Sequence, residues 1–288
     1  MQLTSRLFAV RTLIMFAVAA FCLSFSKSFV MNVMIILGQA HFSMAYLYQY
    51  KAGKVDRQYV IKYVCLFIGL FGGFSLFGWE RTLGFVAGTY FVLHFLYDER
   101  FLLAEKSDFY GWMRLMPVLV IFAARSLYDW YQIDLLSYAA ALATSGFIVW
   151  AGNLVRNRRR PNYQDISFVL VFMLGMVFVY GEPIVGPSAQ RNTLSFIIIT
   201  HYMNWYFHYL VRFSDKPQIL KTLVRDIVLI NGALFILFLG YHYFDGAAAD
   251  YGRFIFEPSF FYLWTLMHYM VTFRPTDLRN WVPASSRV

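Results

Sequence analysis

Histidines are the residues in this chain best suited to do chemistry. All six lie in or at the edge of long apolar segments, although ionisable side chains are costly in an apolar environment and usually serve a function there. Five fall in four segments that we expect to run in the same direction, which places them in one layer: His41, His94, His201, His208 and His268. Neutral imidazoles bind iron, copper and zinc, so this layer predicts a metal site.

The alternative for any single histidine is a structural role, as a buried side chain that hydrogen-bonds a neighbouring carbonyl or tyrosine. Five in one layer favour the metal. His242 is different, because it lies beside Tyr241 and Tyr243 at the end of its segment and is typical of a membrane interface.

Two polar residues accompany these histidines. Asn204 lies between His201 and His208, and all three share one helix face, with the two histidines about 10.5 Å apart along the axis. One metal ion does not easily reach both, so two sites, or one ligand and one supporting residue, are expected. Asp98 follows His94 by one turn and is either a ligand, a residue that orients a histidine, or an interfacial charge.

The amino-acid composition indicates the kind of fold that positions these histidines. Of 288 residues, 59% are hydrophobic and 14% are charged, whereas a soluble domain carries about 25% charged residues. The apolar runs are continuous and approach the roughly 20 residues that cross a bilayer as a helix. These features exclude a soluble enzyme, a disulfide scaffold, a disordered chain and a β-barrel. The expected fold is an all-α, polytopic transmembrane helix bundle.

Ten segments qualify as spans, although eight or nine crossings remain possible because two segments are short. They form a single transmembrane domain over residues 1–288, with candidate spans at residues 7–25, 29–49, 60–79, 82–97, 112–128, 134–152, 166–181, 192–211, 226–244 and 255–273.

The basic residues fix the expected orientation. With alternating spans and a cytoplasmic N-terminus, 20 of the 25 lysines and arginines fall on the cytoplasmic side. We therefore expect both termini in the cytoplasm, in a bacterial inner membrane. The net charge of +9 is then explained by topology, so no nucleic-acid partner is expected. Cys22 and Cys65 are expected to be small buried side chains.

The histidine segments resemble those of Brp/Blh-type β-carotene dioxygenases, which are polytopic membrane enzymes. The resemblance lies in residues 39–46 (QAHFSMAY), 94–98 (HFLYD), 200–208 (THYMNWYFH) and 268–275, which ends in Phe-Arg-Pro. The order of the four segments is kept. The first lacks the family's proline and aspartate, and the spacing differs in the other three.

The resemblance implies a non-haem iron centre held by histidines, which uses O₂ to cleave an isoprenoid in the membrane. Our first hypothesis is therefore an iron oxygenase that acts on a carotenoid, an isoprenoid or another lipid, with any partner subunit unidentified. A haem electron-transfer protein is the second, because the predicted depths pair His41 with His201 and His94 with His208. A transporter or lipid-binding protein with a histidine proton relay is the third.

Overall fold

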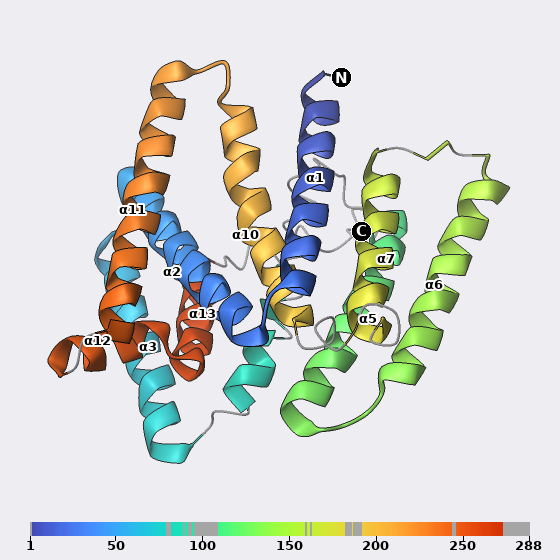
Figure 1. Cartoon of the computed structure of the whole chain (residues 1–288). Coiled ribbons are helices and arrows are strands. Elements are labelled where there is room, and N and C mark those ends of the chain that lie inside the picture. The colour runs from blue at the N-terminus through green and yellow to red at the C-terminus, as the bar shows by residue number, and fades with distance from the viewer. Residues whose placement is uncertain are drawn as a thin grey trace. The chain divides into compact units, whose positions relative to one another are not determined.

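The chain is all-helical wherever the structure describes it. The computed structural model describes residues 2–78, 82–88, 90–91, 94, 109–158, 160–161, 163–181, 186, 192–243 and 246–272, and none of these forms a strand. The helices are α1 (Gln2–Ser24), α2 (Lys27–Lys51), α3 (Arg57–Phe77), α5 (Phe109–Tyr131), α6 (Leu136–Arg156), α7 (Tyr163–Tyr180), α10 (Thr193–Arg212), α11 (Pro217–Tyr243), α12 (Ala247–Phe256) and α13 (Pro258–Thr272) (Figure 1). The predicted helical class is confirmed.

Five of the described helices are long and apolar enough to cross a membrane, namely α1, α2, α3, α6 and α11. Shorter apolar stretches occupy Leu119–Tyr128 in α5 and Asp165–Tyr180 in α7. The five helices are compatible with a membrane protein. Ten crossings, and the cytoplasmic position of both termini, stay predictions.

The last predicted span differs from the structure. Within this predicted span, at residues 255–273, the described residues form the end of α12 and then α13 (Pro258–Thr272), with a break at Glu257. Pro258 starts the new helix, because its ring clashes with a continuing helix but suits the first helical position. The described part of α13 comprises 15 residues.

The residues group into two compact units, each built from separated stretches of chain. The first unit comprises Met1–Lys27, Gly88–His208 and Pro275–Val288, and the second comprises Ser28–Ala87 and Tyr209–Arg274. Two compact units of helices can belong to one membrane domain, so the single domain over residues 1–288 stays a prediction.

In the first unit, α5 packs beside both α6 and α7, and α1 packs beside α7 (Figure 1). The start of α10 is tied to the ends of two other helices. Asn192 donates from Nδ2 to the Cys22 carbonyl of α1 at 2.7 Å, and the Thr193 hydroxyl donates to the Phe178 carbonyl of α7 at 3.0 Å. The last carbonyls of a helix have no partner within it, so these side chains satisfy groups that would otherwise be costly.

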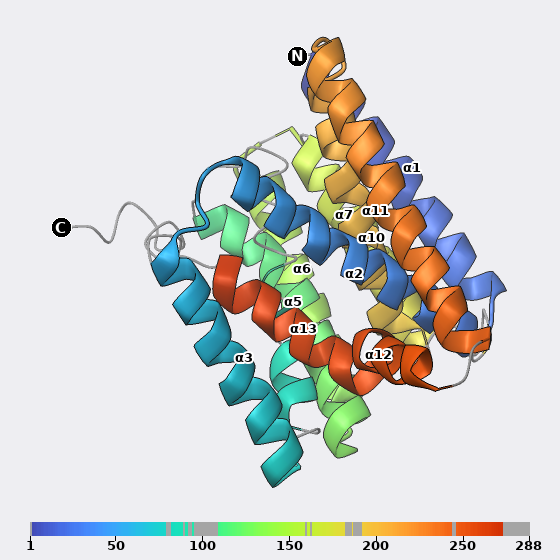
Figure 2. The ribbon, with the colours of Figure 1, turned by 90° about the vertical axis from the view of Figure 1, so that its left-hand side faces the viewer.

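In the second unit, α13 packs along α3, and α12 connects α11 to α13 (Figure 2). The exposed fraction of Phe71 on α3 is 8%, and its ring lies 5.4 Å from that of Trp264 on α13. Of the described α3 residues only Phe71 and Gly73 are buried, which leaves most of this helix facing outward. The expectation that Cys65 is buried is therefore wrong, whereas Cys22 on α1 is buried as expected.

Candidate histidine site

His41 and His268 form a close pair in the second unit. Their ring centroids lie 5.2 Å apart with an angle of 68° between the rings, and each residue is 3% exposed. Phe42 stacks on His268 at 4.8 Å between centroids, and Tyr46 contacts the same imidazole edge-on at 6.1 Å. The pair therefore lies in a densely packed aromatic environment.

Side chains at the end of α12 position both helices of this pair. Gln39 donates from Nε2 to the Ile255 carbonyl at 2.7 Å, and Trp264 donates from its indole nitrogen to the Phe254 carbonyl at 3.0 Å. Gln39 precedes His41 by two residues on α2, and Trp264 precedes His268 by one turn on α13. The last carbonyls of α12 thus anchor α2 and α13 near the positions of His41 and His268.

His94 and His201 form a second pair, in the first unit. Their ring centroids are 5.1 Å apart, again with an angle of 68° between the rings. Phe91 contacts His201 edge-on at 5.5 Å and His94 at 6.4 Å, so one phenyl ring borders both imidazoles. His201 is 1% exposed, whereas His94 is only half-buried.

α10 holds His201 in place. Residues 195–202 of this helix are all buried, so no side of that stretch faces outward. Phe196 stacks on Phe178 of α7 with centroids 4.3 Å apart, next to the hydrogen bond from Thr193. The helix is therefore fixed at its start, one to two turns before His201.

The spacing within each pair fits two neighbouring ligands of one metal ion. A metal–nitrogen distance of about 2.1 Å places the metal roughly 3.2 Å from the ring centroid. Two imidazoles at a tetrahedral angle then have centroids roughly 5.2 Å apart, and two on opposite sides of a metal roughly 6.4 Å. The observed 5.1 Å and 5.2 Å match the first arrangement.

Each pair by itself supplies two ligands. Among the described residues there is no group of three or more histidines, cysteines, aspartates or glutamates close enough to share a metal. Asp98, predicted to lie near His94, is outside the described residues. Among the described residues, each pair therefore supplies two of the ligands that a metal site would need.

The structure also describes the positions of His208, Asn204 and His242. His208 is 7% exposed and Asn204 is 2% exposed, and both lie on α10 beyond His201. His242 packs edge-on against Phe238 with centroids 4.4 Å apart, and it is exposed near the end of α11, as an interfacial residue would be. The pairs that the structure shows differ from the two equal-depth pairs on which the haem hypothesis was based.

Several supporting residues were not predicted from the sequence. Phe42 and Phe91 are part of a general excess of phenylalanine, so nothing distinguishes them. Gln39 does carry a signal, because it is an amide within an apolar segment and must find a partner there.

Comparison with known proteins finds no family model, no curated protein and no solved structure that matches this chain.

Proposed function

We propose that this protein is an integral-membrane, non-haem iron oxygenase that acts on a carotenoid, an isoprenoid or another lipid. The observation that supports it is the pairing of four of the five predicted ligands. Each pair joins two helices and has the centroid spacing of neighbouring ligands. We place the protein in a bacterial inner membrane, in line with its apolar helices and the expected distribution of its basic residues.

Iron, when bound, would supply the O₂ chemistry that amino-acid side chains lack. The imidazoles would bind it as neutral ligands through one ring nitrogen each. Phe42 and Phe91 would fix the orientation of these rings and exclude water. Asp98, Asn204 and His208 are candidates to complete or orient the ligand set.

The same ring-centroid distances favour a non-haem iron site over a haem site. Two axial histidines of a haem would hold their centroids roughly 6.4 Å apart, which is more than either pair shows. A Soret band in the purified protein would contradict this inference.

The reaction is tested by O₂ uptake. Protein loaded with Fe²⁺ without oxygen is mixed with aerated buffer and either β-carotene or an apolar extract of bacterial membranes. We expect uptake that needs both iron and lipid, that is lost in His201→Phe and His268→Phe, and that persists in His242→Phe. Iron-loaded protein that consumes no O₂ with either lipid would overturn the oxygenase.

A further inference from the structure

One buried carboxylate in the second unit holds two cations. Asp226 on α11 is 4% exposed, and one of its oxygens accepts from the Lys51 ammonium at 2.5 Å. Its other oxygen accepts from Nη2 of Arg225 at 2.9 Å and from Nε of the same residue at 3.2 Å. The Tyr48 hydroxyl donates to the oxygen that binds Lys51, at 3.4 Å. Two cations that share one carboxylate are held close together.

This cluster carries more positive charge than Asp226 neutralises. One cation balances the carboxylate, and the other leaves an excess of one positive charge. The side chains of Lys51 and Arg225 are 38% and 61% exposed, so both reach the surface. An ammonium group has three N–H donors and a guanidinium group has five, and the bonds to Asp226 use one and two of them. Both cations therefore keep donors for an anion that approaches from outside.

The surface that continues from these cations along α11 is apolar. Leu229 follows Arg225 by four residues and Ile236 follows it by eleven, so all three lie on one face of the helix. Leu229 is 61% exposed and Ile236 is 68% exposed, on a helix long and apolar enough to cross a membrane. Tyr50 precedes Lys51 on α2 and is 71% exposed, as is typical of a tyrosine at a membrane interface. The cations thus lie at the end of an exposed apolar stripe.

The chemistry of this surface selects the ligand. Ammonium and guanidinium groups form strong hydrogen bonds with phosphate oxygens. A free phosphate would use the cations alone, whereas a phospholipid also covers the apolar stripe with its acyl chains. A zwitterionic headgroup brings a positive charge of its own, which the two cations repel. An anionic phospholipid therefore fits best, and basic sites between membrane helices are known to bind such headgroups.

We propose that Lys51 and Arg225 bind the phosphate of an anionic phospholipid, whose acyl chains lie along the exposed face of α11. Asp226 positions the two cations. The site does not require that the histidines bind a metal, so its test is independent of the proposed oxygenase.

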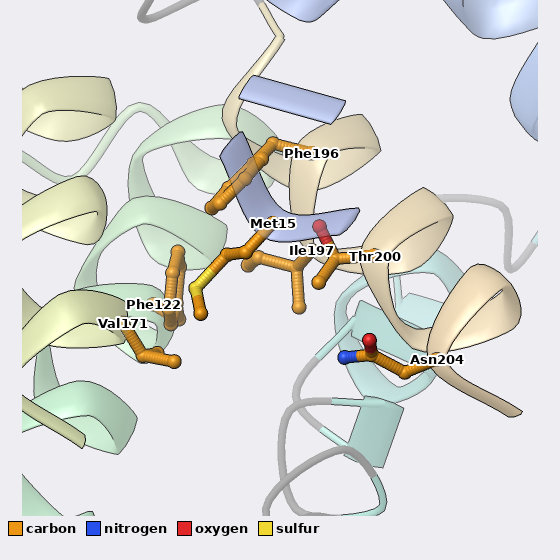
Figure 3. Close-up of a pocket in the computed structure, with 7 residues that line it drawn as sticks. All are labelled: Met15, Phe122, Val171, Phe196, Ile197, Thr200 and Asn204. Carbon is orange, nitrogen blue, oxygen red and sulfur yellow. The ribbon is translucent and has the colours of Figure 1, made fainter. Parts of the chain in front are cut away.

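The pocket described in the first unit does not compete for this lipid. The side chains of Met15, Phe122 and Phe196 are part of its wall, and the space between them is only about 10 Å³ (Figure 3). This is room for one water molecule at most. A lipid bound in the experiment below is therefore not in this pocket.

Native mass spectrometry of detergent-purified wild-type protein tests the proposal. The protein is titrated with phosphatidylglycerol, or with phosphatidylcholine of the same chains, in about 0.15 M ammonium acetate, which screens charges more than roughly 8 Å away. We expect phosphatidylglycerol to bind at least about tenfold more tightly than phosphatidylcholine, because each cation near an anionic headgroup contributes about fivefold. Excess inorganic phosphate should not displace the lipid, because it makes no contact with the apolar stripe.

Two variants assign the preference to the cluster. Arg225→Gln and Lys51→Gln each remove one cation, and both are expected to fold because these side chains reach solvent. Each should lower the affinity for phosphatidylglycerol about fivefold and leave that for phosphatidylcholine nearly unchanged. Lys216→Gln is the matched control, because it removes the same charge from an exposed residue about 13 Å from Arg225 along the α11 axis. It should change the affinity by less than about twofold.

The proposal is overturned if wild type binds the two lipids equally, or if Lys216→Gln weakens phosphatidylglycerol binding as much as the two cluster variants do. Displacement by inorganic phosphate would also overturn it, because the cations would then bind a free anion and not a lipid. None of these results bears on the histidines, whose metal binding is measured separately.

Discussion

The two histidine pairs have nearly the same geometry and very different surroundings. Their centroid distances differ by only 0.1 Å, and both show an angle of 68° between the rings. In the second unit both imidazoles are 3% exposed. In the first unit His201 is fully buried and its partner His94 is only half-buried. If the proposed metal binds at both pairs, equal geometry with unequal access predicts that the two pairs exchange it at different rates.

The difference follows from how each pair is held. His41 and His268 lie on helices that α12 fixes through the hydrogen bonds of Gln39 and Trp264. His201 lies on α10, which is held by its packing and by the hydrogen bonds that Asn192 and Thr193 make at its start. Variants that disturb one kind of support should therefore affect one pair and spare the other.

The largest expected effect is that of Phe42→Ala. This ring stacks on His268 at 4.8 Å and on Phe261 at 5.8 Å, and Phe42 is 3% exposed. Its loss leaves a cavity beside the second-unit pair and should lower the free energy of unfolding by about 3–5 kcal/mol. A denaturant titration in detergent measures this change.

The control for Phe42→Ala is Phe235→Ala on α11, whose side chain is 51% exposed. It should cost less than about 1 kcal/mol. Equal losses for both variants would mean that the second-unit pair is not the tightly packed site described here.

A smaller effect is expected for Asp226→Asn. This buried carboxylate on α11 accepts from Lys51 of α2 at 2.5 Å and from Arg225 at 2.9 Å. The two cations are 38% and 61% exposed, so water compensates part of the loss. We expect the free energy of unfolding to fall by roughly 1–2 kcal/mol.

Asp226→Asn should also loosen α2, so a probe of His41 should respond while a probe of His201 should not. Glu257→Gln is the control, because its contact with Arg253 at 3.0 Å is exposed. Its cost should stay below about 0.5 kcal/mol. If both variants lowered the free energy of unfolding equally, the Lys51–Asp226 contact would not be what holds α2 in place.

The smallest effect is a difference in reactivity between the pairs. Diethyl pyrocarbonate acylates accessible imidazoles, and buried ones react only when the structure opens locally. His94 should therefore react at least about tenfold faster than His41, a difference of about 1.4 kcal/mol. Time-resolved peptide mapping gives both rates in one sample. Equal rates would contradict the unequal access on which the comparison depends.

The sequence predicted the helices well because long apolar runs determine them locally. It did not predict the break at Glu257, because the run stays apolar across it and only Pro258 marks it. The break is stabilised by Gln39 and Trp264, which donate to the α12 carbonyls from elsewhere in the chain. The local pattern indicates that Gln39 needs a partner, but not that the partner is a carbonyl 216 residues away in the sequence.

The same limit applies to the candidate site. Residue type and position selected five histidines as metal ligands, and that role stays a prediction. The structure brings four of them together in two pairs, and the sequence did not indicate which residue lies next to which. Predicted depth paired His41 with His201, whereas tertiary packing places its ring 5.2 Å from His268.

Iron content is the most direct test of the central claim that the paired histidines hold a metal. Protein purified in detergent is loaded with Fe²⁺ without oxygen, desalted and assayed for iron, for wild type and for His41→Phe, His201→Phe and His242→Phe. We predict that wild type and His242→Phe retain the same amount of iron, and that His41→Phe and His201→Phe each weaken binding at their own pair at least about tenfold and so retain less iron than wild type. Wild-type protein that retains no iron, or paired variants that retain as much as His242→Phe, would contradict the claim.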